Sequence, residues 1–478
     1  MDANVLTIKE TKEGLKNREF SSIELTKACL EQIKKYNSQI NAFITVCEEK
    51  ALEEAKRADK LFGYETLQQF KTYPLLGIPV ALKDLFSTKG IKTTAASKIL
   101  KNYIPPYDAT VVKKLKDAGA IIIGKTNHDA WGHGASGENS DFGPTKNPWD
   151  GEYVPGGSSS GSAAAVASHM CLAATGTDTG GSSRLPASLC GVVGLKPTYG
   201  RVSRYGVIAM ASSLDSIGHI TKTVEDSALF LQITSGNDAQ DATTPKIPVP
   251  DYLEKISQGI KGIKIGLPKE YFTNGLDINI KNLMKKAVKV LENLGALIIE
   301  ISLPHTEYAN ACYYIIQPSE VSSNLARYDG IRFGDGRERF GDEAKRRIML
   351  GTFTLSAGYY EAYYKKAMQI RTLIKRDFDN AFNSSRNGVD AIVTPVSPTP
   401  AWKLGEKVNE PLKMYLSDVF TVTANLAGIP GLSIPVGFAN GLPVGMQVLG
   451  PQFSEKMLFR IGYAYEQLSQ FYKIKPKL

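Results

Sequence analysis

Two glycine- and serine-rich turns enclose a run of small residues, and this stretch restricts the possible fold more than any other part of the chain. The first turn begins at Pro155 and reads Pro-Gly-Gly-Ser-Ser-Ser-Gly. The second begins at Gly176 and reads Gly-Thr-Asp-Thr-Gly-Gly-Ser-Ser-Arg. The alanine-rich run between them, from Ser162 to Thr175, predicts one short buried helix. Because glycine lets a backbone turn sharply and approach a ligand closely, two such turns around one helix indicate a built site.

The two turns carry the groups that acyl transfer needs. Successive turn N–H groups cradle negative charge, and serine hydroxyls beside such a cradle place a nucleophile next to an oxyanion pocket. The alternative is a flexible Gly/Ser linker. We favour the site, because the intervening Ala, Val, Met and Leu side chains need burial and a linker has nothing to bury.

The length and composition of the chain are typical of an ordinary globular protein. Its 478 residues are 42% hydrophobic and 22% charged, which suffices for a large core in one to three domains. No run is apolar enough to cross a membrane, and the first residues do not form a secretory signal. The five cysteines are scattered without CxxC spacing. We therefore expect no disulfide framework, no zinc site, no membrane association and a cytoplasmic location.

Neither the net charge nor a search for metal-binding motifs points to a particular function. The net charge of +9 is mild for this length and is spread along the chain, so on its own it is a weak argument for nucleic-acid binding. The sequence has no HExxH motif, EF-hand loop or paired-carboxylate signature. Metal catalysis therefore has no support in the sequence.

Hydrophobic periodicity predicts alternating strands and helices, which favours an α/β sandwich with one large sheet. A capping box at Ser21 and Glu24 begins an early helix, and Asn440-Gly441 predicts a hairpin. The Pro- and Asp-rich segment 237–262 is the best candidate for a boundary. We expect strands near 42–47, 75–82, 120–123, 263–267, 296–301 and 390–393, and helices near 51–61, 109–118, 228–234, 280–294, 343–382, 414–426 and 455–469.

Residues 119–126 match the P-loop pattern, but we expect the match to be accidental. They read Gly-Ala-Ile-Ile-Ile-Gly-Lys-Thr. A P-loop needs a strand, a glycine-rich loop and then a helix, whereas here a predicted helix comes first. Three consecutive isoleucines favour a buried strand instead.

Residues 157–161 match the G-x-S-x-G nucleophile elbow, which would make Ser159 the nucleophile. The elbow follows a strand directly, and the preceding Asn-Pro-Trp-Asp-Gly-Glu-Tyr from Asn147 is typical of turns. None of the five histidines is an obvious base for such a serine. His169 lies on the predicted helix of small residues, and we expect its imidazole to be packed or on the surface rather than catalytic. This α/β-hydrolase hypothesis is the weaker one.

Lysine can activate a serine when burial lowers the pKa of its ammonium from about 10.4 towards neutrality. Lys83 directly follows the apolar residues Ile78 to Leu82, where a surface lysine is unexpected. Periodicity alone favours the alternative, a strand-end lysine whose ammonium reaches water.

Three segments together resemble the amidase signature family over essentially the whole chain: 77–84, 155–159 and 176–184. The resemblance implies an α/β/α sandwich with one large mixed sheet covered by helices on both faces. It also implies one domain over residues 1–478, with a catalytic core at about 70–220 and a helical substrate-pocket region at about 305–430.

Four further segments, 142–149, 196–206, 211–215 and 345–352, are most similar to the A subunits of tRNA-dependent amidotransferases. That resemblance implies hydrolysis of glutamine and transfer of ammonia through a tunnel to a partner subunit. The partners would be the B and C subunits of a heterotrimer, which contact tRNA and use ATP and Mg²⁺, with no cofactor in this chain. Both Glu-tRNA(Gln) and Asp-tRNA(Asn) stay open as acceptors.

The resemblance also implies roles for individual residues. Ser182 would be the nucleophile, Ser158, after a cis peptide bond, would relay its proton, and Lys83 would be the base. The glutamine carboxylate would pair with Arg347, its amino group with Asp418, and its amide would lie near Tyr313, chemistry that suits a forked guanidinium and a carboxylate. The oxyanion hole would consist of backbone N–H groups of Thr179, Gly180, Gly181 and Ser182.

Some positions depart from the family pattern. Residues Ala135-Ser136-Gly137 stand where Ser-Ser-Thr is usual, and Ser183 and Leu185 stand where Ile and Gln are usual. Two alternatives therefore stay open beside the glutaminase hypothesis: a stand-alone amidase for another carboxamide, and a non-catalytic scaffold. Arg347 also has a simpler interpretation, a solvated basic helix end beside Lys345 and Arg346.

Overall fold

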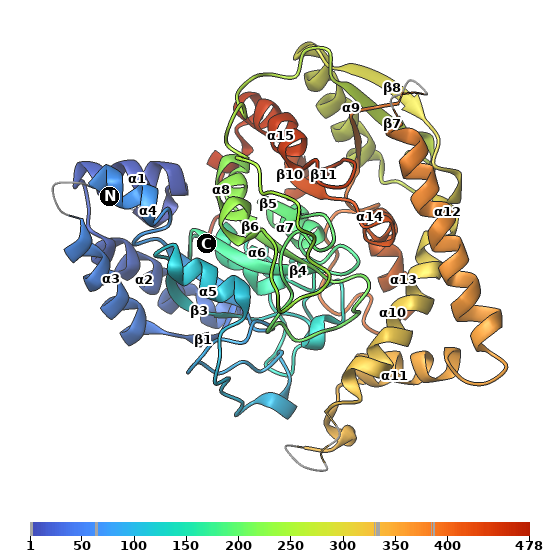
Figure 1. Cartoon of the computed structure of the whole chain (residues 1–478), viewed down its shortest axis with the longest axis horizontal. Coiled ribbons are helices and arrows are strands. Elements are labelled where there is room, and N and C mark those ends of the chain that lie inside the picture. Colours follow the sequence, from blue (N-terminus) through green and yellow to red (C-terminus); the bar gives the residue numbers. More distant parts are fainter. Residues whose placement is uncertain (1–2, 63–65, 329, 331–334, 384, 386–387) are drawn as a thin grey trace.

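One mixed sheet runs through the whole molecule (Figure 1). The structure is a computed structural model of the chain, and it describes residues 3–62, 66–328, 330, 335–383, 385 and 388–478. Within these residues, eleven strands pair in the order β1-β3-β2-β4-β6-β5-β10-β11-β9-β7-β8. The strands are β1 (Phe43–Val46), β2 (Pro79–Lys83), β3 (Ile121–Thr126), β4 (Ala173–Asp178), β5 (Val193–Lys196), β6 (Ser216–Thr221), β7 (Lys264–Pro268), β8 (Leu297–Ile301), β9 (Ala391–Pro395), β10 (Gly431–Ala439) and β11 (Leu442–Leu449).

Strands β2, β3 and β4 bring three chain segments to one edge of the sheet. Strand β2 pairs in parallel with both β3 and β4, and Lys83 at its end aligns with Thr126 at the end of β3. Because parallel strands end on the same side, their carboxyl ends form a natural place for a site. Lys83, Thr126 and Asp178 are the last residues of these three strands.

Helices cover both faces of the sheet, as predicted. On β6, a Cβ on Gly218 would lie 2.7 Å from the Ser183 hydroxyl at the start of α7. The next residue, His219, contacts Ser227 of α8 at 2.8 Å, and neighbouring strand residues point to opposite faces. The helices are α1 (Ile8–Asn17), α2 (Ser22–Ile40), α3 (Glu48–Leu61), α4 (Thr66–Thr72), α5 (Thr110–Asp117), α6 (Ser160–Ala167), α7 (Arg184–Cys190), α8 (Val224–Thr234), α9 (Ile278–Asn293), α10 (Ala309–Leu325), α11 (Asp342–Thr354), α12 (Lys366–Ala381), α13 (Pro411–Tyr415), α14 (Val422–Ala427) and α15 (Glu455–Ser469).

Several sequence predictions are confirmed. Ser21 and Glu24 form the capping box that begins α2. The Asn440-Gly441 turn joins β10 to β11, with both residues in the left-handed region. The P-loop match is accidental, because its isoleucines lie in the fully buried strand β3. Ser159 directly precedes α6, and no named strand comes immediately before it in this fully described region, so the nucleophile elbow is excluded.

The prediction of one helix between the glycine-rich turns is wrong in its second half. Helix α6 ends at Ala167, the chain reverses at His169, and β4 begins at Ala173. Strand β4 pairs with β2 on one side and β6 on the other. Small residues such as these are compatible with either a helix or a strand. The pairing of β4 with a neighbouring strand on each side determines that this segment is a strand.

The long helical predictions are also interrupted. The stretch 343–382 divides into α11 and α12 with a π-helical turn, Tyr360–Lys365, between them, and Gly358 adopts a left-handed conformation before that turn. The stretch 414–426 divides into α13, a 3₁₀ turn at Leu416–Asp418 and α14. In the second case the break lets the Thr421 hydroxyl donate to the Gly180 carbonyl at 2.6 Å.

Candidate active site

Lys83 is completely buried at the end of β2. Its Nζ donates to Thr177 Oγ1 at 2.7 Å, to Ser158 Oγ at 2.8 Å and to Ser159 Oγ at 3.0 Å. Burial lowers the pKa of Lys83 to about 7, against the opposing effect of nearby aspartates. The hypothesis that this ammonium reaches water is therefore wrong, and a neutral amine is accessible near neutral pH.

Ser158 and Ser182 lie on turns that the backbone ties together. The peptide bond between Gly157 and Ser158 is cis, as the family resemblance implies. The Ser159 N–H donates to the Ser182 carbonyl at 3.1 Å, which holds the two glycine-rich turns side by side. Ser182 is 8% exposed. Within the described residues, its hydroxyl makes no hydrogen bond to Ser158, so the complete relay is not formed in this structure.

A buried ion pair shapes the turn that carries Ser182. The Asp178 carboxylate accepts from the N–H groups of Gly181 at 2.9 Å and Ser183 at 3.1 Å, and pairs with Arg184 at 3.0 Å. Burial alone would raise the pKa of Asp178, but the Arg184 guanidinium and further donors lower it to about 2. The turn thus wraps around a carboxylate that stays ionised.

The N–H groups of this turn divide into engaged and unengaged donors. The Gly181 N–H already donates to Asp178. In the described part of the chain, the N–H groups of Thr179, Gly180 and Ser182 have no acceptor. Unpaired backbone donors in a buried turn are unusual and need a partner. Three of the four N–H groups expected at an oxyanion hole are therefore unengaged.

Tyr313, on α10, lies against this turn. A Cβ on Gly180 would be 2.6 Å from the Tyr313 hydroxyl, so only glycine fits there. Burial raises the pKa of Tyr313, which therefore stays a neutral hydroxyl. Its neighbour Tyr314 donates to Asp418 at 2.9 Å. These adjacent tyrosines connect the serine turns to Asp418, the side chain predicted to bind the amino group of the substrate.

Arg347, on α11, is 3% exposed, so the hypothesis of a solvated helix end is wrong. Its Nε donates to Glu343 at 2.7 Å and its Nη1 to Gln317 at 2.8 Å, and its guanidinium lies over the rings of Tyr314 and Tyr415. Burial opposes the charge of Arg347, but the Glu343 carboxylate raises its pKa. Burial raises the pKa of the Asp418 carboxyl to about 7, and a bound ammonium would restore its charge.

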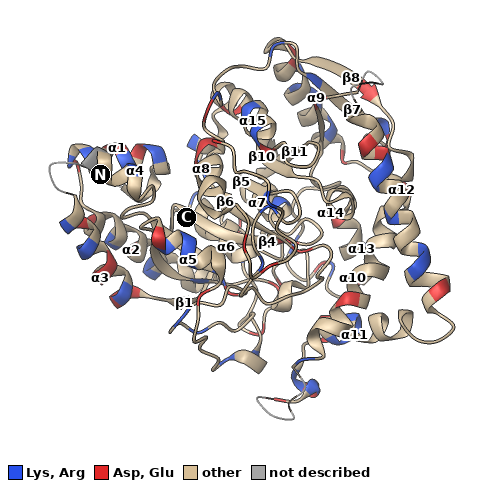
Figure 2. Ribbon diagram, in the orientation of Figure 1, with Lys and Arg blue, Asp and Glu red and all other residues tan. Residues whose placement is uncertain are grey.

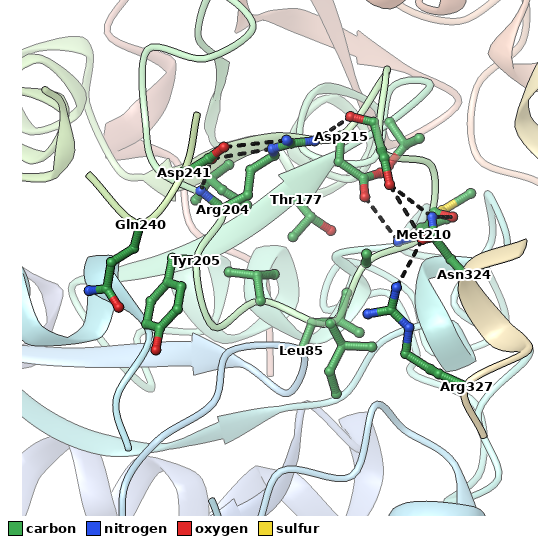
Figure 3. A pocket seen from close by; sticks show the side chains of 16 residues that line it. Leu85, Thr177, Arg204, Tyr205, Met210, Asp215, Gln240, Asp241, Asn324 and Arg327 are labelled. Carbon is green, nitrogen blue, oxygen red and sulfur yellow. Dashed lines mark hydrogen bonds and ion pairs between the residues drawn. The ribbon is translucent and has the colours of Figure 1, made fainter. Parts of the chain in front are cut away.

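Two cavities adjoin this region, and they share none of their described lining residues. One of about 320 Å³ is lined by Arg347, Tyr314, Tyr415 and His133 among others. The other, of about 260 Å³, ends at Thr177 and Thr179 and is drawn in Figure 3. Thr177, whose hydroxyl accepts from Lys83, therefore connects the second cavity to the lysine. Ser182 and Asp418 are not among the described residues that line either cavity.

Comparisons with known proteins decide the family. A family model described as Amidase matches residues 24–459. The chain belongs to the amidase family. Among its relatives is the A subunit of glutamyl-tRNA(Gln) amidotransferase from Carboxydothermus hydrogenoformans, 53% identical over 493 residues and 100% of both chains. The corresponding protein of Geobacter metallireducens is 53% identical over 98% of each chain.

Solved structures of amidases share this fold. The A subunit of glutamyl-tRNA(Gln) amidotransferase from Thermotoga maritima has a TM-score of 0.81 at 46% identity and covers 98% of this chain and 96% of its own. A peptide amidase from Stenotrophomonas maltophilia has a TM-score of 0.82 at 31% identity, over 97% of both chains. The fold predicted from the sequence, a mixed sheet between helices, is thus the fold of these amidases.

The positions that depart from the usual amidase pattern lie next to the turns. Ala135 and Leu185 belong to one small apolar cluster with Val154 and Trp402, so these two departures lie in the same apolar core. The Ser183 hydroxyl is buried and has no hydrogen-bond partner among the described residues. A Cβ on Gly176 of β4 would be 2.8 Å from it, so Ser183 packs against the sheet, and it is not among the described residues that line either cavity.

Sequence reasoning missed four polar residues of this amidase. Thr177, Asp178 and Arg184 hold Lys83 and the Ser182 turn, and Asp129 is a completely buried carboxylate just after β3. The sequence contains one signal for Asp129. The polar residues Asn127-His128-Asp129 come directly after strand β3, just as Lys83 is the last residue of strand β2. Polar residues at the ends of adjacent parallel strands meet at one edge.

Two other kinds of site are absent from the described residues. No group of three His, Cys, Asp or Glu side chains there is arranged to hold a metal ion. No described helix is long and apolar enough to cross a membrane.

Proposed function

We propose that this amidase hydrolyses glutamine as the A subunit of a tRNA-dependent amidotransferase and supplies ammonia to a partner subunit. The observation that carries the proposal is the Lys83 amine, which is completely buried and lies 2.8 Å from the hydroxyl of Ser158. A lysine with a pKa of about 7 is matched to proton transfer near neutral pH. The 53% identity to glutamyl-tRNA(Gln) amidotransferase A subunits supports the choice of substrate.

The proposed chemistry uses three polar groups, Lys83, Ser158 and Ser182, in the roles that the family resemblance implies. Neutral Lys83 takes the proton of the Ser158 hydroxyl, and Ser158 takes the proton of Ser182 as its oxygen attacks the glutamine side-chain amide. The oxyanion receives hydrogen bonds from unengaged N–H groups of the turn, worth about 3 kcal/mol per donor. The proton returns to the leaving nitrogen, ammonia departs, and water then hydrolyses the γ-glutamyl ester of Ser182.

Three other residues, Arg347, Asp418 and Tyr313, would recognise glutamine. Arg347 pairs with the α-carboxylate and Asp418 with the α-ammonium, while Tyr313 lies beside the reacting amide at Gly180. Arg347 has an Nη2 that is not committed to Glu343 or Gln317. A buried guanidinium and a buried carboxyl suit a zwitterionic amino acid, because each gains an opposite charge.

The remaining steps belong to partners. Ammonia reaches a B subunit that uses ATP and Mg²⁺ to amidate the acceptor, either Glu-tRNA(Gln) or Asp-tRNA(Asn), and a C subunit completes the heterotrimer in the cytoplasm. The second candidate function is a stand-alone amidase. It is favoured by the likeness to the peptide amidase structure and by the departures at Ala135 and Leu185.

Two adjacent serines provide a matched test of the nucleophile. Ser182→Ala should abolish release of ammonia from glutamine, by about ten-thousandfold or more. Ser183→Ala should leave most of the activity, because that hydroxyl is buried against the sheet without a partner. Mass spectrometry after treatment with an electrophilic glutamine analogue should find the label on Ser182. A label on Ser159 or Ser183 would overturn the assignment.

Partners are tested separately. The chain is purified from its host under mild conditions, copurifying proteins are identified, and the complex is assayed for glutamine-dependent amidation of Glu-tRNA(Gln). Glutamine hydrolysis without any copurifying protein and without transamidation would favour the stand-alone amidase.

A further inference from the structure

Asp129 is a buried carboxylate at the point where three segments of the site meet. It lies just after β3 and is completely inaccessible to solvent. Its oxygens accept from the N–H of Gly137 at 3.0 Å and of Asn139 at 3.0 Å. Its own N–H donates to the Ser158 carbonyl at 3.3 Å. Asp129 therefore joins the segment that lines the larger cavity to the turn that carries Ser158.

The packing around this carboxylate is tight. A Cβ on Gly157 would collide with Asp129 Oδ2, and a Cβ on Gly134 would collide with the same carboxylate. Glycine at both positions allows the backbone to close on the carboxylate. The position of Asp129 thus determines how closely the Gly157–Ser158 peptide approaches the cavity segment.

Asp129 is also distinguished by its charge partners. Three aspartates act on Lys83: Asp129, Asp178 and Asp215. Asp178 is paired with Arg184, and Arg204 acts on Asp215, which also accepts from Thr179 at 2.6 Å. Lys83 favours the ionisation of Asp129, while Glu138 opposes it. Of the three, Asp129 has the greatest effect on Lys83.

We propose that Asp129 is a positioning residue for the amide hydrolysis, which fixes the Ser158 turn and provides the negative charge that balances the proton on Lys83. When Ser158 passes its proton to Lys83, the resulting ammonium is inaccessible to bulk solvent. A nearby carboxylate stabilises that ammonium. Burial raises the pKa of Asp129 to about 7, so the carboxylate and the amine respond to each other in the same pH range.

The test measures the rate at which a fluorophosphonate labels Ser182 between pH 5.5 and 9. Labelling needs the nucleophile and its base but not recognition of glutamine. In Asp129→Asn the missing negative charge destabilises the ammonium, so the acid limb should move to lower pH by about one unit. The matched control is Asp226→Asn, another buried aspartate that accepts backbone N–H groups, here from α1. It should lower thermal stability and leave the acid limb in place.

A second variant keeps the inference testable if Asp129→Asn does not fold. Asp129→Glu retains the charge but adds a methylene to a packed position. Its acid limb should stay within about 0.3 unit of the wild type, while the maximal labelling rate falls about tenfold or more because the Ser158 turn is displaced. An unmoved acid limb in Asp129→Asn, or full activity in Asp129→Glu, would overturn the inference.

Parallel assays separate this inference from the proposed function, on which it rests for the reaction. Wild-type protein that is labelled on Ser182 but releases no ammonia from glutamine would refute the proposed substrate. The role of Asp129 would still be decided by the labelling profiles.

Discussion

At the scale of single residues, Lys83 and Lys125 show how burial alone does not define a catalytic group. Both lysines are completely buried on neighbouring strands, β2 and β3. Lys125 is neutralised by Asp84 at 2.9 Å, whereas the partners of Lys83 are hydroxyl groups. A buried amine without a contacting carboxylate loses its proton far more easily. The difference in partners is why we propose Lys83, and not Lys125, as the base.

We expect Lys83→Arg to abolish glutamine hydrolysis, by about a thousandfold or more in kcat/KM, because a guanidinium keeps its proton at all accessible pH values. In the wild type, the pKa of Lys83 near 7 predicts that kcat/KM rises as pH increases through about 7, since the neutral amine is the active form. Steady-state kinetics between pH 5.5 and 9 test both points. Lys125→Arg is the control. Near-normal turnover by Lys83→Arg would show that Lys83 contributes only packing or positive charge and is not the base.

The sequence alone was sufficient for some of these residues and not for others. Lys83, Ser158 and Ser182 could be named because each lies within a recognisable family motif. Asp129 lies outside those motifs. Thr177 lies inside one, but its role could not be named because its contact with Lys83 arises from strands that meet only in the folded sheet. Periodicity favoured a solvated Lys83, and it cannot detect burial at the end of a central strand.

At the scale of elements, long or buried segments with a strong pattern were predicted well, and segments of small residues were not. Helix α15 and strands β7 and β8 lie within about one residue of their predicted positions. Strands β4, β5 and β6 were missed, although they form the middle of the sheet. Their small and polar residues carry little periodicity, and pairing with neighbouring strands rather than local preference determines their structure.

The Asp178–Arg184 pair joins β4 to α7 and should dominate the stability of this region. Arg184→Met leaves a buried carboxylate without its cation, which should lower the free energy of unfolding by about 3–5 kcal/mol. The pKa of Asp178 is about 2 in the folded protein against about 3.9 when unfolded. Its contribution is therefore present above pH 4 and is lost as pH falls towards 2. Urea unfolding at pH 7 and pH 3 measures both effects, and equal stability of variant and wild type would contradict them.

Helices α10, α11 and the turn before α14 together should decide which amide is hydrolysed. Arg347→Ala should lower kcat/KM for glutamine by about a hundredfold to a thousandfold, the range for breaking a desolvated charge pair. Glutaminamide lacks the carboxylate, so the same variant should reduce its disadvantage relative to glutamine. Arg346→Ala is the control, because Arg346 is only partly buried on the same helix. Unchanged glutamine kinetics in Arg347→Ala would favour the stand-alone amidase.

At the scale of the whole molecule, the distribution of charge is as informative as the fold. The net charge is +9, but basic and acidic residues are interspersed on the most highly charged helices, such as α1, α3 and α12 (Figure 2). Some of the lysines and arginines are also paired within their own helix, such as Lys375 with Asp379 and Lys289 with Glu292. An extended nucleic-acid surface needs basic side chains gathered on one face.

We therefore expect the isolated chain to bind tRNA weakly and with little selectivity, and a tRNA-dependent reaction to need a partner that supplies the binding surface. Binding is measured by fluorescence anisotropy with labelled tRNA(Gln) between 50 and 200 mM salt, with an unrelated tRNA as the control. A few nonspecific phosphate contacts lose most of their affinity over that range, because each contact releases condensed counterions. The two tRNAs should therefore give similar, steeply salt-dependent curves. Tight binding that favours tRNA(Gln) at 150 mM salt would place acceptor recognition on this chain and contradict the division of labour between subunits.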